Sequence, residues 1–146
     1  ISQRNIKSIH YGEYLDWWKE VQYLIPINSI FTVRDLETGK TWKMKRTIGA
    51  NHADCEPLTE TDTQIMKSVW GGEFSWERRP VLILFNGRQI AASASCMPHS
   101  VQYISTNSVN GHFDIHFPNS TRHKDGQRDE EHQYNILIAA GFRNLK

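Results

Sequence analysis

The residues whose types and spacing could do chemistry are concentrated in residues 110–123, which hold three of the seven histidines. Successive side chains of a strand point to opposite faces, so this segment predicts that His112, Asp114 and His116 share one face. The alternate positions are apolar and would face a core, namely Phe113, Ile115 and Phe117. Two imidazoles and a carboxylate in one row are more typical of a metal or acid/base site than of an ordinary half-buried strand.

Strand geometry limits how this row could bind an ion. His112 and His116 are four residues apart, which separates them by about 13 Å along a straight strand. One ion therefore fits two adjacent same-face positions better, either His112 with Asp114 or Asp114 with His116, unless the chain bends near Gly111. The remaining ligands would come from loops on either side of the row, which offer His52 with Asp54, or His99 with His123.

The wider distribution of histidines also favours a metal site. Five of the seven lie between His99 and His132, and a sixth, His52, lies in a polar stretch. Zinc sites combine nitrogen, sulfur and carboxylate ligands, and catalytic ones leave a position for water. We predict that the metal ligands come from a pool of five residues, His52, Asp54, His112, His116 and His123. The predicted proton-transfer residues are Asp114, Glu56 and His99. The alternative is a fold in which hydrogen-bonded histidines are structural and no metal binds.

The two cysteines suggest a competing chemistry. Cys96 lies three residues before His99, and a cysteine next to a histidine can be an activated thiolate. Cys55 and Cys96 are not a Cys-x-x-Cys pair, so free thiols, one disulfide and a metal ligand all remain open. The metal hypothesis is favoured over the thiol hypothesis.

Aromatic and basic residues offer possible substrate contacts. Tryptophans are more often core or lid residues than platforms for sugar rings. This is the favoured interpretation for four of the five in this chain, Trp17, Trp18, Trp70 and Trp76. Arg78 and Arg79 precede Pro80 and could grip a carboxylate, although a solvated strand start is the favoured interpretation.

Length and composition narrow the class of protein. The 146 residues suit a single domain, residues 1–146, with a core of its own. Seventeen Lys and Arg against 16 Asp and Glu give no electrostatic reason to expect a nucleic acid or an anionic membrane as partner. The longest apolar runs, such as residues 81–85, are far too short for a bilayer, so no membrane span is expected.

Hydrophobic periodicity and turn residues predict the elements that must position these side chains. Helices are expected at Glu13–Leu24, from Thr59 or Thr61 to Trp70, and at about Asp129–Ala140. Besides the histidine row, strands are expected at Ser29–Arg34, Thr41–Lys45, Val81–Phe85 and Gln89–Ser93. Residues 49–57, 95–108 and 119–128 are expected to be loops. The fold class is therefore α+β, a compact antiparallel β-sheet or small β-barrel with flanking helices.

An ordered set of short motifs carries a family resemblance. The set comprises Asp16-Trp17-Trp18, Asn51-His52-Ala53-Asp54, Glu56-Pro57-Leu58-Thr59, Gly71-Gly72, Ser75-Trp76, Arg79-Pro80, Ala91-Ala92-Ser93, Met97-Pro98-His99, Gly111-His112-Phe113, Ile115-His116-Phe117, Ser120 with His123, and His132-Gln133. Over nearly the whole chain it resembles a family of cell-wall domains from Gram-positive, mainly spore-forming bacteria. Those domains often follow LysM or other peptidoglycan-binding modules in exported proteins.

The resemblance implies a secreted, cell-wall domain that acts on peptidoglycan with zinc, alongside other wall-binding domains in the full-length protein. Family members often have Cys at the position of Asp114, and Gly at those of Cys96 and Ser100. Aspartate and cysteine can both bind zinc, so the first difference is compatible with a metal site. It excludes a thiol mechanism at position 114.

The predicted function is therefore a zinc-dependent enzyme that degrades peptidoglycan by hydrolysing an amide bond. Two alternatives remain at this stage. One is a lytic transglycosylase, which would cleave the glycan strand and use a sugar hydroxyl in place of water. The other is a non-catalytic module that binds peptidoglycan through its tryptophans and its histidine-rich face.

Overall fold

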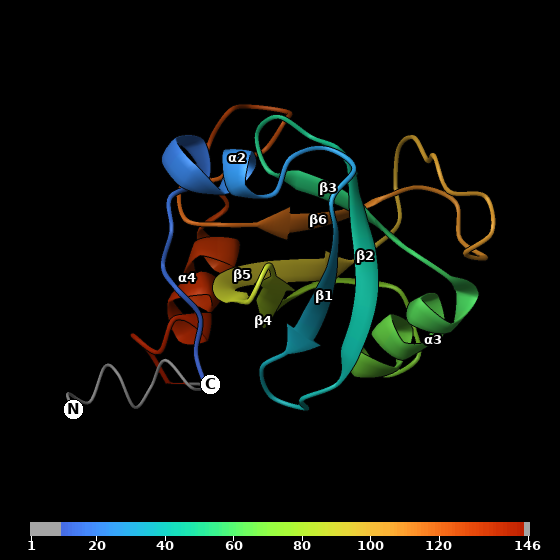
Figure 1. Cartoon of the computed structure of the whole chain (residues 1–146), viewed down its shortest axis with the longest axis horizontal. Coiled ribbons are helices and arrows are strands. Elements are labelled where there is room, and N and C mark those ends of the chain that lie inside the picture. Colours follow the sequence, from blue (N-terminus) through green and yellow to red (C-terminus); the bar gives the residue numbers. More distant parts are fainter. Residues whose placement is uncertain (1–9, 145–146) are drawn as a thin grey trace.

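Six antiparallel strands close into a small barrel in the computed structural model, which describes residues 10–144 (Figure 1). The strands are β1 (Ile30–Asp35), β2 (Thr41–Ile48), β3 (Ala53–Pro57), β4 (Ser75–Phe85), β5 (Arg88–Cys96) and β6 (Phe113–His116). They follow one another around the barrel in the order β1-β2-β3-β6-β5-β4. The expected α+β fold with a small barrel and flanking helices is confirmed.

Alternating burial explains the strands that the sequence predicted. In β1, Phe31 and Val33 point into the barrel and are buried, whereas Ile30 is exposed. The β4–β5 hairpin turns at Asn86 and Gly87, which both have positive φ angles, 50° and 75°. This is the backbone of a tight hairpin turn that Asn-Gly favours.

Short helices cover the outside of the barrel. They are the π-helical turn η1 (Trp17–Val21), which continues into α2 (Gln22–Leu24), and the helices α3 (Glu60–Val69) and α4 (Glu130–Ala139). Thr59 and Asp62 form a reciprocal capping box at the start of α3. Asp129 caps α4 by accepting a hydrogen bond from the backbone N–H of His132.

The first predicted helix, Glu13–Leu24, begins too early, because the helical turn starts only at Trp17. Glu13 instead pairs with Ile90 as a single β-bridge. Asp16 accepts a hydrogen bond from the backbone N–H of Lys19 and so starts the helical turn at Trp17. The apolar spacing before Asp16 thus reflects packing of an extended segment on the barrel.

The loop predicted over residues 49–57 was wrong in its second half, where β3 runs between β2 and β6. All five residues of β3 are buried, including Asp54 and Glu56. Two carboxylates in five residues suggested a solvated loop. In the structure, other polar segments cover both carboxylates, so these charged side chains are buried although charged residues are usually exposed.

A buried arginine supports the barrel next to this strand. Arg46 is 4 % exposed, and its guanidinium donates to the carbonyl oxygens of Gln22, Ile25 and Gly49. Its carbon Cζ also lies 4.7 Å from the ring centre of Trp17. The contacts join the helical turn η1 and helix α2 to β2.

Replacing Arg46 by alanine is therefore expected to lower the free energy of unfolding by about 3 kcal/mol, since three carbonyl groups lose a charged donor. Urea denaturation followed by far-UV circular dichroism measures the change. The matched control is Lys43→Ala, which truncates an exposed cation on the same strand. Equal stability of the two variants would contradict this assignment.

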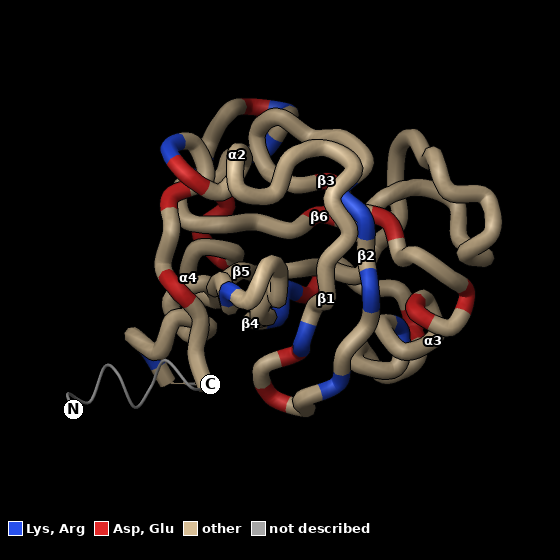
Figure 2. Tube along the Cα trace, viewed as in Figure 1, with Lys and Arg blue, Asp and Glu red and all other residues tan. Residues whose placement is uncertain are grey.

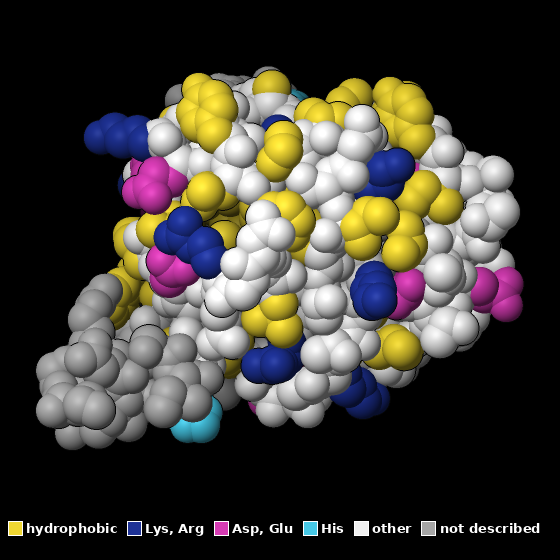
Figure 3. Space-filling view, viewed as in Figure 1, with side chains coloured by type: hydrophobic (Ala, Val, Ile, Leu, Met, Phe, Trp, Pro, Cys, Tyr) yellow, Lys and Arg dark blue, Asp and Glu magenta, His cyan; other side chains and the backbone are white. Residues whose placement is uncertain are grey.

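Charges are distributed over the whole chain, with basic residues recurring along β2 (Figure 2). On the face shown in Figure 3, hydrophobic side chains lie in small groups between charged and other polar surface. Within residues 10–144, the helices are too short and too polar to cross a membrane, as expected.

Candidate metal centre

The candidate site begins with two aspartates on the neighbouring strands β3 and β6. The register of the strands places Asp54 directly opposite Asp114. The residues flanking them in sequence belong to the barrel core, namely Ala53, Cys55, Phe113 and Ile115. Both carboxylates therefore face outward on the same side of the sheet. Like charges directly opposite each other are unfavourable, so this pairing indicates a place for a cation.

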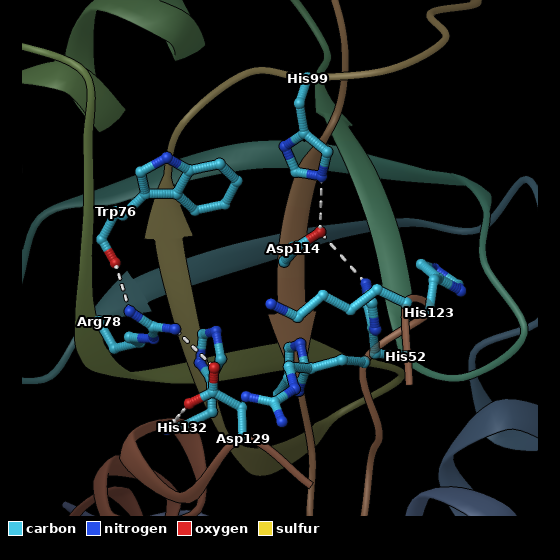
Figure 4. A pocket seen from close by; sticks show the side chains of 11 residues that line it. His52, Trp76, Arg78, His99, Asp114, His123, Asp129 and His132 are labelled. Atoms are coloured by element: carbon cyan, nitrogen blue, oxygen red, sulfur yellow. Dashed lines mark hydrogen bonds and ion pairs between the residues drawn. The ribbon is translucent and has the colours of Figure 1, made fainter. Parts of the chain in front are cut away.

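Three histidines surround the two carboxylates, and Figure 4 shows two of them, His52 and His99, on either side of Asp114. Nε2 of His52 lies 2.8 Å from Oδ1 of Asp54 and 3.1 Å from Oδ1 of Asp114. Nε2 of His99 lies 3.0 Å from the same oxygen of Asp114. Nε2 of His112 lies 3.7 Å from Oδ1 of Asp54. We call these five residues the His–Asp cluster.

Backbone pairing brings His99 and His112 together, although 13 positions separate them in the chain. Each donates its N–H to the carbonyl oxygen of the other, at 3.0 and 2.8 Å. The intervening loop is tied to β3 by Glu56, whose carboxylate accepts hydrogen bonds from the backbone N–H groups of Tyr103 and Ile104. The fold thus delivers donors to the cluster from several separate segments.

The second ring nitrogen of each histidine in the cluster faces a backbone carbonyl. Nδ1 of His52 lies 2.8 Å from the carbonyl oxygen of Thr121. Nδ1 of His99 lies 2.8 Å from that of Met97, and Nδ1 of His112 lies 2.9 Å from that of Val101. A carbonyl oxygen only accepts, so each Nδ1 carries a proton. In the neutral ring the lone pair then lies on Nε2, which faces the carboxylates. Such bonds orient the histidine ligands of metal sites.

The carboxylates favour positive charge on His52 and His99. Burial opposes protonation of His52, but its hydrogen bonds to Asp114 and Asp54 raise its pKa to about 10. The bond to Asp114 also raises the pKa of His99, against the effect of burial. Burial would raise the pKa of Asp114, yet its bonds from His52 and His99 hold that pKa far below its usual range. The cluster is therefore suited to a cation between its carboxylates, which either protons or a metal ion can supply.

The other two predicted ligands lie at the edge of the cluster. Nε2 of His123 lies 3.0 Å from Oδ2 of Asp54, and the side chain is half-exposed. His116 is buried, and its ring stacks on that of His52 with 4.3 Å between the ring centres. Within residues 10–144, no group of mutually close donors contains both His112 and His116. This agrees with the spacing expected along a strand.

Two predicted roles are not supported by the positions of the residues. Glu56 is fully buried and holds the loop after β5, away from the open pocket, so its position indicates a structural role rather than proton transfer. Cys96 is fully buried, and burial raises its pKa to about 12, which disfavours the thiolate. Cys55 and Cys96 are both free thiols, so the disulfide alternative is wrong.

An open pocket of about 360 Å³ lies beside the cluster, and His52, His99 and Asp114 line it (Figure 4). At its mouth, the half-exposed ring of Trp76 lies 5.2 Å from that of His99, centre to centre. On the opposite wall, His132 is buried, and burial and the charge of Arg78 lower its pKa to about 3. The pocket therefore places the candidate metal next to space for a ligand.

Sequence patterns placed only part of this site. They offered Asp114 and His99 both as ligands and as proton-transfer residues, and both have donor atoms inside the His–Asp cluster. They gave no role to Arg122 and Lys124, which line the pocket. Their place next to His123 in the chain was the signal available, because a loop that supplies one site residue often supplies others.

Comparison with known proteins gives no match, whether the chain is compared with protein-family models, with curated proteins or with solved structures.

Gly111 is required for the contact between His99 and His112. Its φ angle is +110°, and a Cβ at this position would lie 2.6 Å from the backbone nitrogen of His99. Gly111→Ala is therefore expected to displace His99 and to weaken metal binding by at least about tenfold, as loss of ligand orientation does elsewhere. Competition with a chelating dye measures the affinity. Gly39→Ala is the control, since Gly39 also has a positive φ but open space around its Cα. Unchanged affinity in Gly111→Ala would contradict the assignment.

Proposed function

We propose that the protein is a zinc-dependent hydrolase that cleaves an amide bond in peptidoglycan. The observation that carries this proposal is the convergence of three histidines on two facing carboxylates beside an open pocket, with the Nε2 of each ring oriented by the hydrogen bond that its Nδ1 donates to a backbone carbonyl. Nitrogen and carboxylate oxygen donors of this kind suit zinc.

The residues present fit a divalent ion in charge as well as in donor type. Three or four residues of the cluster would hold it, since the ligand atoms of Asp54, His99, His112 and Asp114 lie within 4.8 Å of one another, and Nε2 of His52 lies within 3.1 Å of both carboxylates. The two carboxylates balance its double charge. When bound, zinc polarises a carbonyl group and lowers the pKa of a water molecule to about 7. Among the predicted site residues, His123 is best placed to move a proton, because it contacts Asp54 and is half-exposed.

Peptidoglycan is proposed as the substrate from the family resemblance of the sequence motifs, and secretion to the cell wall belongs to the same proposal. Hydrolysis of an amide is favoured over transglycosylation because a metal-activated water is a direct nucleophile for a carbonyl carbon. The exposed ring of Trp76 at the pocket mouth is compatible with contact to a sugar or a peptide.

The test is digestion of purified peptidoglycan followed by mass spectrometry of the soluble fragments. We expect fragments with new amino termini or free stem peptides, loss of activity after chelation and recovery with zinc. His99→Ala should be inactive, whereas His10→Ala, which changes an exposed histidine outside the cluster, should be fully active. Anhydro-sugar ends would instead indicate a lytic transglycosylase. Binding without any released fragment would indicate a non-catalytic module, and either outcome would overturn the proposal.

A further inference from the structure

The adjacent arginines Arg78 and Arg79 have different surroundings. Arg79 donates to both carboxylate oxygens of Asp35, which is fully buried. Arg78 instead lines the pocket beside the His–Asp cluster. Of these two arginines, only Arg78 is therefore available to a ligand in this pocket.

Arg78 is held in position before any ligand binds. Its Nη2 donates to Oδ2 of Asp129 at 2.5 Å, and its Nη1 donates to the carbonyl oxygen of Trp76 at 3.3 Å (Figure 4). Asp129 is itself fixed as the N-cap of α4. Nε of Arg78 is buried, so a ligand in the pocket would contact the Nη groups, which have four N–H donors between them for the bonds to Asp129 and Trp76. A guanidinium with its plane fixed and donor capacity left over is suited to bind a planar anion.

The other charged residues of the pocket add to this preference. Its lining contains three cationic side chains, Arg78, Arg122 and Lys124, and two carboxylates, Asp114 and Asp129. Arg122 is paired with Asp125 outside the pocket, whereas Lys124 is exposed at its edge. Asp114 faces the rings of His52 and His99, so Arg78 and Lys124 are the side chains of the lining that attract an anion.

We propose that Arg78 and Lys124 form a carboxylate-binding subsite next to the metal centre. This inference rests on the proposed hydrolase and narrows its substrate to amides that carry a free carboxylate close to the scissile bond. Trp76 would lie against the chain that connects the two groups. Stem peptides of peptidoglycan carry free carboxylates, whereas an unsubstituted sugar ring does not. The subsite therefore favours a peptide-side bond over a glycosidic bond.

The experiment measures binding of two small probes to the zinc-loaded protein by NMR titration. N-acetyl-D-alanine carries the carboxylate, and N-acetyl-D-alaninamide is its neutral counterpart. We expect the acid to bind at least about tenfold more tightly than the amide, and Arg78→Gln to remove this difference. Lys124→Gln should reduce it about twofold to threefold, as suits a more exposed charge. Arg88→Gln is the matched control, because Arg88 pairs with Glu13 on the surface, away from the pocket.

The outcomes separate this inference from the proposed function. Equal affinity for acid and amide would overturn the subsite. So would a preference that survives in both Arg78→Gln and Lys124→Gln, because the carboxylate would then bind the metal. If Arg78→Gln does not fold, Lys124→Gln and Arg78→Lys, which keeps the charge but loses the planar fork, decide the question. A subsite confirmed in a protein that releases no wall fragments would refute the hydrolase and leave the subsite standing.

Discussion

Asp114→Asn is expected to remove stoichiometric metal and to lower wall-degrading activity by at least about a hundredfold. Even substitution of a residue that only hydrogen-bonds to a metal ligand lowers metal affinity or activity about tenfold to a hundredfold. Oδ1 of Asp114 lies within 3.1 Å of two histidine nitrogens, so it is the oxygen that connects His52 and His99. Asparagine has nearly the same shape but provides no charge to balance the ion.

Elemental analysis after dialysis, together with competition against a chelating dye, measures this effect. The control is Glu37→Gln, which removes one charge from an exposed side chain on the β1–β2 turn. It should retain the metal content and activity of the unmodified protein. If Asp114→Asn also retained full metal content, Asp114 would not be a ligand. The remaining donors, Asp54 with His52 and His123, would then be the group to test.

The histidine row illustrates how much of the site was predictable from sequence. Its period of two predicted that Phe113 and Ile115 enter the core while Asp114 faces away, and the structure has this arrangement. Strand spacing also predicted that His112 and His116 belong to different donor groups. These features are local, because they depend only on the alternation of side chains along one strand.

The partners of the row could not be predicted in the same way. Asp54 meets Asp114 only because β3 pairs with β6, and β3 was taken for a loop owing to its two acids. His99 reaches the cluster through a single backbone bridge at the end of a loop of irregular structure. Both contacts depend on long-range pairing, which composition and periodicity do not encode. The barrel itself was more predictable, since Asn86-Gly87 and the alternating strands are local signals.

Metal affinity is expected to fall steeply as the pH is lowered. With a pKa of about 10, His52 carries a proton on both ring nitrogens at neutral pH when no metal is bound. A metal ion at Nε2 must displace one of these protons. Each unit decrease in pH raises the proton concentration tenfold, so the affinity should fall about tenfold per unit for this proton alone. The raised pKa of His99 makes the dependence steeper at pH values where that ring is also protonated.

Calorimetric zinc titrations in two buffers with different ionisation enthalpies count the released protons directly. We expect at least one proton per ion at pH 7, and the same number in His10→Ala. Release of no protons, with an affinity independent of pH, would show that the metal does not bind at Nε2 of His52. That result would leave only donors whose protonation does not compete with the ion.

The same competition predicts how activity depends on pH. At limiting zinc, the acidic loss of activity should follow the loss of metal, and added zinc should shift it to lower pH. His123, in contrast, lies at the edge of the cluster and is half-exposed, so His123→Gln should lower activity without removing the metal. Lower activity of His123→Gln at saturating zinc, with unchanged metal content, would identify His123 as the proton carrier. An acidic loss of activity that zinc abolishes completely would assign the whole acidic dependence to the His–Asp cluster.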